Sequence, residues 1–225
     1  MGVISNLMFA VGFKVSDSGL QDAENQVENT KTAVIGLGIA AGVALAGFGI
    51  AAVNAASQFE QAMSQVQMAT GATNDQMGET REIAKELYSQ NFGQDWNDLG
   101  SAITSVHSIT GQAGDALKET TKNALLMRDA FGQEVNESVK AADTMMRQFG
   151  ITSTDSFTLL AQAQQKGMDK SGDLLDTANE YANQFKALGF TAEEMFDTLA
   201  AGSQNGAFNL DKVGKQQHCR LKIAG

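Results

Sequence analysis

The sequence contains no proline, one cysteine and two histidines in 225 residues. Without proline, no helix is obliged to break or kink. The single cysteine, Cys219, excludes an intramolecular disulfide framework. Basic residues are also scarce, and the net charge of −10 argues against a sequence-specific nucleic-acid partner. A chain without proline suits long or numerous helices, and its 23 glycines can punctuate them, so we expect an all-α fold with glycine-ended loops.

Motifs of enzymes and metalloproteins are absent as well. The sequence holds no GxSxG, HExxH, CxxC or P-loop pattern. His107 adjoins an apolar helix face and has no second ligand at a metal spacing such as i+4, so we interpret it as a core or surface histidine. Methionines at helical spacing are interpreted as core residues, and the carboxylates as mainly outward-facing. We therefore expect no catalytic activity, no cofactor and no metal.

An uncharged run from Ala33 to Val53 contains five Gly, seven Ala and nine larger apolar residues. As a helix it would be about 31 Å long, which matches the thickness of a bilayer core. Its glycines weaken that interpretation, because each costs about 1 kcal/mol in a helix relative to alanine. The run also lacks flanking Trp or Tyr, and Lys31 is the only nearby basic residue before it. Membrane insertion is therefore predicted to be marginal.

Within this run, GLGIAA at 36–41 recurs as GFGIAA at 47–52, which is 11 residues or about three helical turns later. Small residues at such spacing let helix backbones approach closely, so we predict a helix-packing or membrane face through which copies of the chain associate. A buried Gly/Ala-rich core helix is the alternative. A dinucleotide-binding site is disfavoured, because no strand precedes the GxGxxA letters and no βα alternation follows. The glycines of the predicted face are Gly36, Gly38, Gly42, Gly47 and Gly49.

The rest of the chain is predicted to form one strand and several helices. Alternating apolar residues from 7 to 15 predict a short strand, and a polar helix follows up to residue 32. The helix of the apolar run is expected to continue to about residue 69. Between 72 and 206, apolar stripes at helical spacing predict a bundle of six or seven short helices.

Local signals fix several helix ends in that bundle. Thr73 with Gln76, and Thr191 with Glu194, form capping boxes, and Phe190 with Met195 adds a hydrophobic staple to the second box. The last helix is expected to end at Gly202. Trp96 is predicted to be a core aromatic residue.

Three segments resemble a known family: SQFEQAMSQVQMATGAT at 57–73, LLMRDAFG at 125–132, and SGDLLDTANEYANQFKALGFTAEEMFDTLAAGSQNGAFNLDKVG at 171–214. They are similar to the N-terminal conserved region of tailed-bacteriophage tail tape measure proteins. The resemblance implies a structural virion protein in the tail lumen, present in several copies, that sets tail length during assembly and leaves when DNA is delivered. Its implied partners are itself, the tail tube, the tail assembly chaperone, the tail tip and, during infection, the host membrane.

The sequence also departs from that family. A helix of 225 residues would span only about 340 Å, which is short for a length ruler. After Gly214 the pattern changes to KQQHCRLKIAG, and residues 211–225 carry a net charge of +3. We hypothesise a truncated or frameshifted tape measure protein, or a short product of a split gene. The alternative is a stand-alone membrane-active protein that inserts through residues 33–53. The predicted segments are 1–32 (strand and polar helix), 33–71 (apolar helix with amphipathic extension), 72–210 (helical domain) and 211–225 (divergent basic tail).

Overall fold

The computed structural model describes residues 49–207 and 209–215, and every regular element in these ranges is helical. The all-α expectation is therefore confirmed for this part of the chain, whereas the predicted strand at 7–15 lies outside it. The chain divides into two compact units, Met1–Ser57 and Gln58–Gly225. The labelled helices are α2 (Gly49–Thr70), α3 (Asn74–Ser89), α4 (Trp96–Thr110), α5 (Gly114–Phe131), α6 (Val135–Phe149), α7 (Ser153–Gln165), α8 (Leu174–Ala187) and α9 (Ala192–Gln204).

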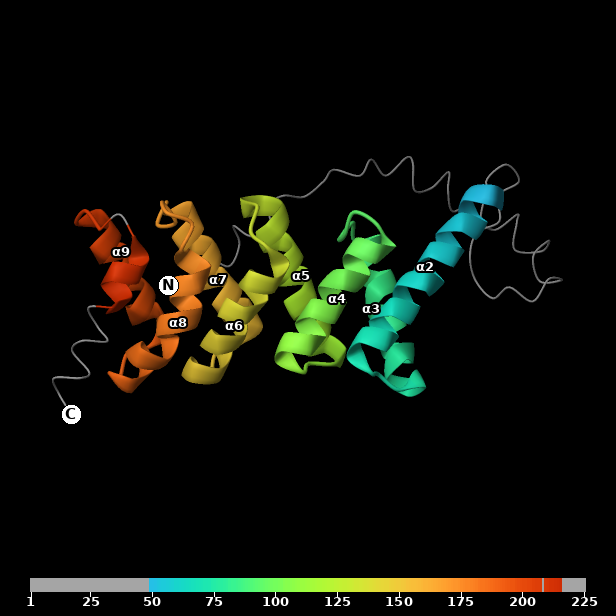
Figure 1. Cartoon of the computed structure of the whole chain (residues 1–225), viewed down its shortest axis with the longest axis horizontal. Helices are drawn as coiled ribbons and strands as arrows, with labels where there is room; N and C mark the ends of the chain where they lie inside the picture. Colours follow the sequence, from blue (N-terminus) through green and yellow to red (C-terminus); the bar gives the residue numbers. More distant parts are fainter. Residues whose placement is uncertain (1–48, 208, 216–225) are drawn as a thin grey trace. The chain divides into compact units, whose positions relative to one another are not determined.

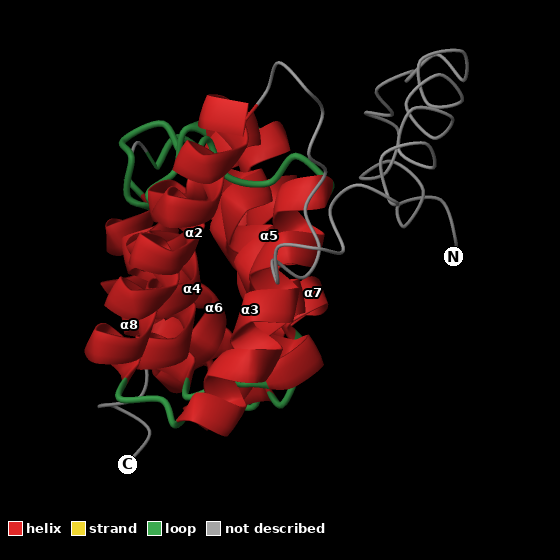
Figure 2. Ribbon diagram, turned by 90° about the vertical axis from the view of Figure 1, so that its right-hand side faces the viewer, coloured by secondary structure: helices red, strands yellow, loops and turns green. Residues whose placement is uncertain are grey.

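The helices of the second unit form two layers. Helices α4, α6 and α8 pack side by side in one layer, and α3, α5, α7 and α9 pack in the other (Figures 1 and 2). Each helix from α3 to α9 also packs on its neighbour in sequence, because a short loop reverses the chain and places the next helix in the opposite layer. The six or seven short helices predicted between 72 and 206 thus correspond to α3 to α9.

The core lies between the layers. It uses the predicted stripe of α4, whereas on α6 Met145 is buried and Met146, which belongs to the predicted stripe, is only half-buried. On α4, Leu99, Ile103 and Val106 are fully buried, and on α6 Val139 and Met145 are equally inaccessible. Full burial of one such side chain stabilises the fold by about 1.5–3 kcal/mol. Most methionines of the unit are core residues, as expected; Met68 on α2 is the exposed exception.

Helix ends follow the local signals closely. Gly111, Gly132 and Gly150 close α4, α5 and α6 in the left-handed conformation, which costs glycine no steric strain. Both predicted capping boxes are confirmed: Thr73 caps α3 with Gln76, and Thr191 caps α9 with Glu194. These ends need only residues that are close to one another along the chain, so the sequence alone reveals them.

Two expectations about single residues need correction. Helix α9 does not end at Gly202 but continues to Gln204, because Gly202 is a close-packing position within the helix. A Cβ there would lie 2.5 Å from Val213 Cγ2. Trp96 is half-buried instead of fully enclosed in the core. The ring of Phe190 packs edge-to-face on Phe185, and its predicted staple with Met195 stays a prediction.

Candidate functional site

The predicted glycine face falls almost entirely outside the described residues. Gly36, Gly38, Gly42 and Gly47 lie there, and Gly49 is the first residue of α2. The face therefore stays a prediction. Across the residues that the structure does describe, no helix is both long enough and apolar enough to cross a membrane.

The two ends of the layered helices differ in their polar contacts. We call the end where α4, α6 and α8 begin the return end, and the end where α3, α5, α7 and α9 begin the hairpin end. At the return end, carboxylates of the loops and of the first turn of α4 accept hydrogen bonds from neighbouring loops and helix ends. Sequence analysis missed these contacts, because it assigned the carboxylates mainly to outward helix faces.

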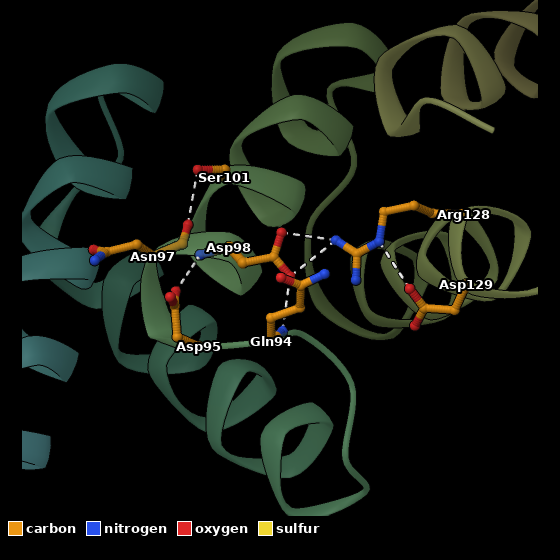
Figure 3. A network of polar contacts seen from close by, with 7 residues as sticks. All are labelled: Gln94, Asp95, Asn97, Asp98, Ser101, Arg128 and Asp129. Atoms are coloured by element: carbon orange, nitrogen blue, oxygen red, sulfur yellow. Dashed lines mark hydrogen bonds and ion pairs between the residues drawn. The ribbon is translucent and has the colours of Figure 1, made fainter. Parts of the chain in front are cut away.

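Asp98 carries the first of these contacts. Its Oδ2 accepts the Gln94 N–H at 2.8 Å, and the carboxylate receives Arg128 Nη1 at 2.7 and 2.9 Å (Figure 3). Arg128 lies near the end of α5, so this ion pair ties the 90–95 loop to a helix of the other layer. Arg128 Nε also donates to Asp129 Oδ1 at 2.8 Å.

Two carboxylates compensate the partly buried positive charge of Arg128. Burial opposes the positive charge of Arg128 most strongly, but hydrogen bonds with Asp129 and Asp98 outweigh it and raise the pKa of the guanidinium. The side chains of Arg128 and Asp98 are 20% and 29% exposed. Two carboxylates thus occupy the guanidinium, which makes this cluster a structural clamp and leaves it a poor anion-binding site.

The 166–173 loop contains the next two carboxylates. Asp169 accepts the Leu174 N–H at the start of α8, and its other oxygen accepts the side-chain amides of Gln133 and Gln164. Asp173 Oδ2 accepts the Asp211 N–H at 3.1 Å. Each contact links the 166–173 loop to another segment at the return end.

Residues 210–215 form a further helical segment that packs on the α8 and α9 side. Tyr181 O–H donates to Asp211 Oδ1 at 2.7 Å, and Lys215 pairs with Asp211 Oδ2 at 2.7 Å. The pKa of Asp211 is lowered, first by the hydrogen bond from Lys215 and then by that from Tyr181. Burial, followed by the Asp211 contact, raises the pKa of Tyr181.

The hairpin end combines contacts within each loop with contacts between helices: Thr120 Oγ1 donates to Ser153 Oγ at 2.9 Å, and Arg147 Nη2 donates to the Ile109 carbonyl oxygen at 3.5 Å. His107 Nδ1 lies 3.0 Å from the Gln112 carbonyl oxygen, and since a carbonyl only accepts, Nδ1 carries the proton. This histidine therefore stabilises a turn, in agreement with its interpretation as a structural residue. Among the described residues no group of His, Cys, Asp and Glu is arranged to hold a metal ion.

An aromatic cluster joins α2, α3 and α4. Trp96 stacks on Tyr88 at a centroid distance of 3.8 Å and meets Phe59 edge-on at 4.8 Å. Arg81 lies over the Phe59 ring and pairs with Glu60 at 2.6 Å. The cluster explains the half-exposed position of Trp96, since its ring covers the seam between helices.

One hollow of about 200 Å³ lies between α7 and α9. Leu159, Ala163 and Phe196 line it together with Lys166, Glu193 and Asp197. Its volume is below the range of about 300–1,000 Å³ that is usual for small-molecule sites.

These contacts indicate the general class of the protein. Buried side chains, capped helix ends and loop clamps all serve helix packing, and the polar clusters are satisfied by one another. The described part of the chain is thus an all-helical packing module.

Comparison with known proteins gives the family. The model of the family "Phage-related minor tail protein" matches residues 88–217, more than half of the chain. The chain belongs to this family of phage tail proteins. It is also 35% identical over 80 residues to the "Probable tape measure protein" of Streptomyces phage phiC31. That alignment covers 35% of this chain but only 11% of the phage protein. No solved structure matches the chain.

Proposed function

We propose that this chain is a structural component of a phage tail that acts as part of a tape measure: a length ruler and assembly scaffold that is released during DNA delivery. The observation that carries the proposal is the family match over 88–217, together with the similarity to a protein named as a probable tape measure protein. No catalysis is needed for such a role. The place of action is the tail lumen of the virion.

The proposed partners are other copies of the chain, the tail tube, the tail assembly chaperone and the tail tip. We propose that the chain binds the tail tube and other copies of itself through different surfaces. The helical unit from 58 to 215 presents polar helix faces, whereas the Gly/Ala-rich run at 33–53 is uncharged. We propose that the run mediates association between copies, because small residues permit close helix approach.

Purified tails test the scaffold role directly. Tails assembled with the intact gene are compared with those from a gene carrying an early stop codon, and tail lengths are measured by electron microscopy. We expect uniform tails containing peptides of the 88–217 region by mass spectrometry, and absent or irregular tails without the protein. Uniform tails of unchanged length without it would contradict the proposal.

A flotation assay separates the scaffold from the alternative, a stand-alone membrane-active protein. The purified chain is mixed with liposomes and, separately, with assembled tail tubes. Cosedimentation with tubes supports the scaffold role. Strong spontaneous flotation with liposomes, without tube binding, would favour insertion through 33–53. A chain lacking residues 33–53 is the control in both arms.

A further inference from the structure

The helical unit contains a repeat that sequence analysis did not predict. The helices of each layer begin at nearly constant intervals of about 39 residues, a length typical of helical repeats. Two layers that advance by the same interval indicate a tandem unit of one helix pair. In one layer, α3, α5, α7 and α9 begin at Asn74, Gly114, Ser153 and Ala192. In the other layer, α4, α6 and α8 begin at Trp96, Val135 and Leu174.

The loops at the hairpin end follow the same interval. Each has a glycine with positive φ, one further residue and then the cap residue before the helix. The first two loops also share their side-chain contacts: Gln67 and His107, which lie one interval apart, both bond the carbonyl that follows the loop glycine. The loop glycines are Gly71, Gly111, Gly150 and Gly189.

The core repeats as well. A small residue recurs at one position of α3, α5, α7 and α9, where the helices need close approach. The first three are buried alanines with at most 1% exposure. In α9 the position is Gly202, which Val213 touches. The members of this column are Ala84, Ala124, Ala163 and Gly202.

We propose that residues 74–215 form a tandem array of one repeated helix pair, in which whole pairs are interchangeable and open one at a time. The second part follows from the packing. From α3 to α9, extensive contacts join a helix only to the next helix and the next but one, so no distant contact locks the array as a whole. Stepwise opening would let a helical chain pass through a narrow tail lumen, a consequence that rests on the proposed function.

The start of a fourth pair is visible at the end of the described chain. Val213 contacts Gly202 of α9, and Gly214 faces the Tyr181 ring of α8. These are the two helices that a member of the α4, α6 and α8 layer would meet at this position. Residues 210–215 therefore begin the next helix of that layer.

Internal deletions in the full chain test the repeat. Two whole-pair deletions each remove one complete interval. Deleting 112–150 joins Gly111 to Ile151 and keeps a glycine-x-threonine loop, and deleting 151–189 joins Gly150 to Phe190 in the same way. The control is a half-pair deletion of 133–150, which also recreates this loop but leaves two helices of the same layer adjacent in sequence.

The expected result is that the whole-pair deletions are tolerated better than the shorter half-pair deletion. Both whole-pair variants should retain a helical circular dichroism spectrum and a cooperative thermal transition, while the half-pair variant should lose the transition. The repeat would be wrong if the control melts as cooperatively as the whole-pair variants, or if both whole-pair variants are unfolded.

Force spectroscopy on the intact chain tests the stepwise opening. Pulling from both ends should give successive extensions of roughly 130 Å, the contour length of about 39 residues. A single extension of the whole array would overturn this part. Both experiments report on folding alone, so their failure leaves the tail-assembly test unaffected, and failure of that test leaves the repeat intact.

Discussion

The hairpin and return ends of the helical unit hold the same helices by different means. At the hairpin end, each short loop has a glycine with positive φ three residues before the next helix and, in most cases, a threonine cap. At the return end, the loops vary in length, and carboxylates such as Asp98 and Asp169 connect them to distant residues. The difference teaches that the loop conformation at the hairpin end is encoded locally, by a glycine and a cap residue, whereas the loops at the return end depend on the assembled layers.

The largest effect is expected at a hairpin-end glycine. Gly150→Ala should destabilise the protein by about 1–2 kcal/mol, because φ is +71° and an L side chain is strained there. No neighbouring atom lies within 4 Å of the added Cβ, so the cost is that of the backbone alone. Gly78→Ala, in the exposed middle of α3, is the matched control and should stabilise by about 0.5–1 kcal/mol. Urea denaturation of both variants measures the effects, and equal signs would contradict this account.

The return end should respond to the loss of its ion pair. Arg128→Met should destabilise by about 1 kcal/mol, since partial exposure screens the two carboxylates that it leaves behind. Lys140→Met removes an exposed pair with Glu137 and should change stability by less than about 0.5 kcal/mol. Thermal denaturation of the two variants compares them. If Arg128→Met destabilises the protein no more than Lys140→Met does, the ion pair does not hold the return end and this account is wrong.

Two substitutions at helix caps of the hairpin end should change the stability in opposite directions. Thr191→Ala removes a side-chain cap and should cost about 1 kcal/mol. Ala113 occupies the same place before α5 without any side-chain cap, so Ala113→Thr should gain about 0.5 kcal/mol. Chemical denaturation reports both values. Loss of stability in Ala113→Thr would show that this loop does not follow the common pattern.

The smallest effect concerns pH at the return end. Because the folded pKa of Asp211 lies below its ordinary value of 3.8, its contribution is present above that pH and is lost as the pH falls through the folded value. Lys215 has a raised pKa, so its contribution is present below 10.5 and declines as the pH rises through the folded value. The stability difference between the protein and Asp211→Asn should therefore be constant between about pH 5 and pH 9 and shrink outside that window. Melting temperatures across pH measure it, and a difference that does not decrease as the pH falls below 3.8 would contradict the assignment.

Much of the helical unit was predictable because its signals are local. The capping boxes at Thr73 and Thr191, the glycine stops after α4 to α6 and the apolar stripes each lie within a few turns of one helix. The polar contacts of the candidate site were harder to predict from the sequence. The bonds between Asp98 and Arg128 and between Gln133 and Asp169 each join segments that a whole helix or more separates along the chain, so neither leaves a short-range pattern.

The sequence by itself determined the all-helical class, most helix boundaries and the resemblance to phage tail proteins, because helix periodicity and capping depend on near neighbours along the chain. Only the tertiary structure decided that the helices form two layers, that Gly202 is a contact position within α9, and that the helix pairs advance by one common interval. The physical reason is that packing selects side-chain size at a position and tolerates changes of residue type. Ala84, Ala124, Ala163 and Gly202 share a role that their flanking sequences do not reveal.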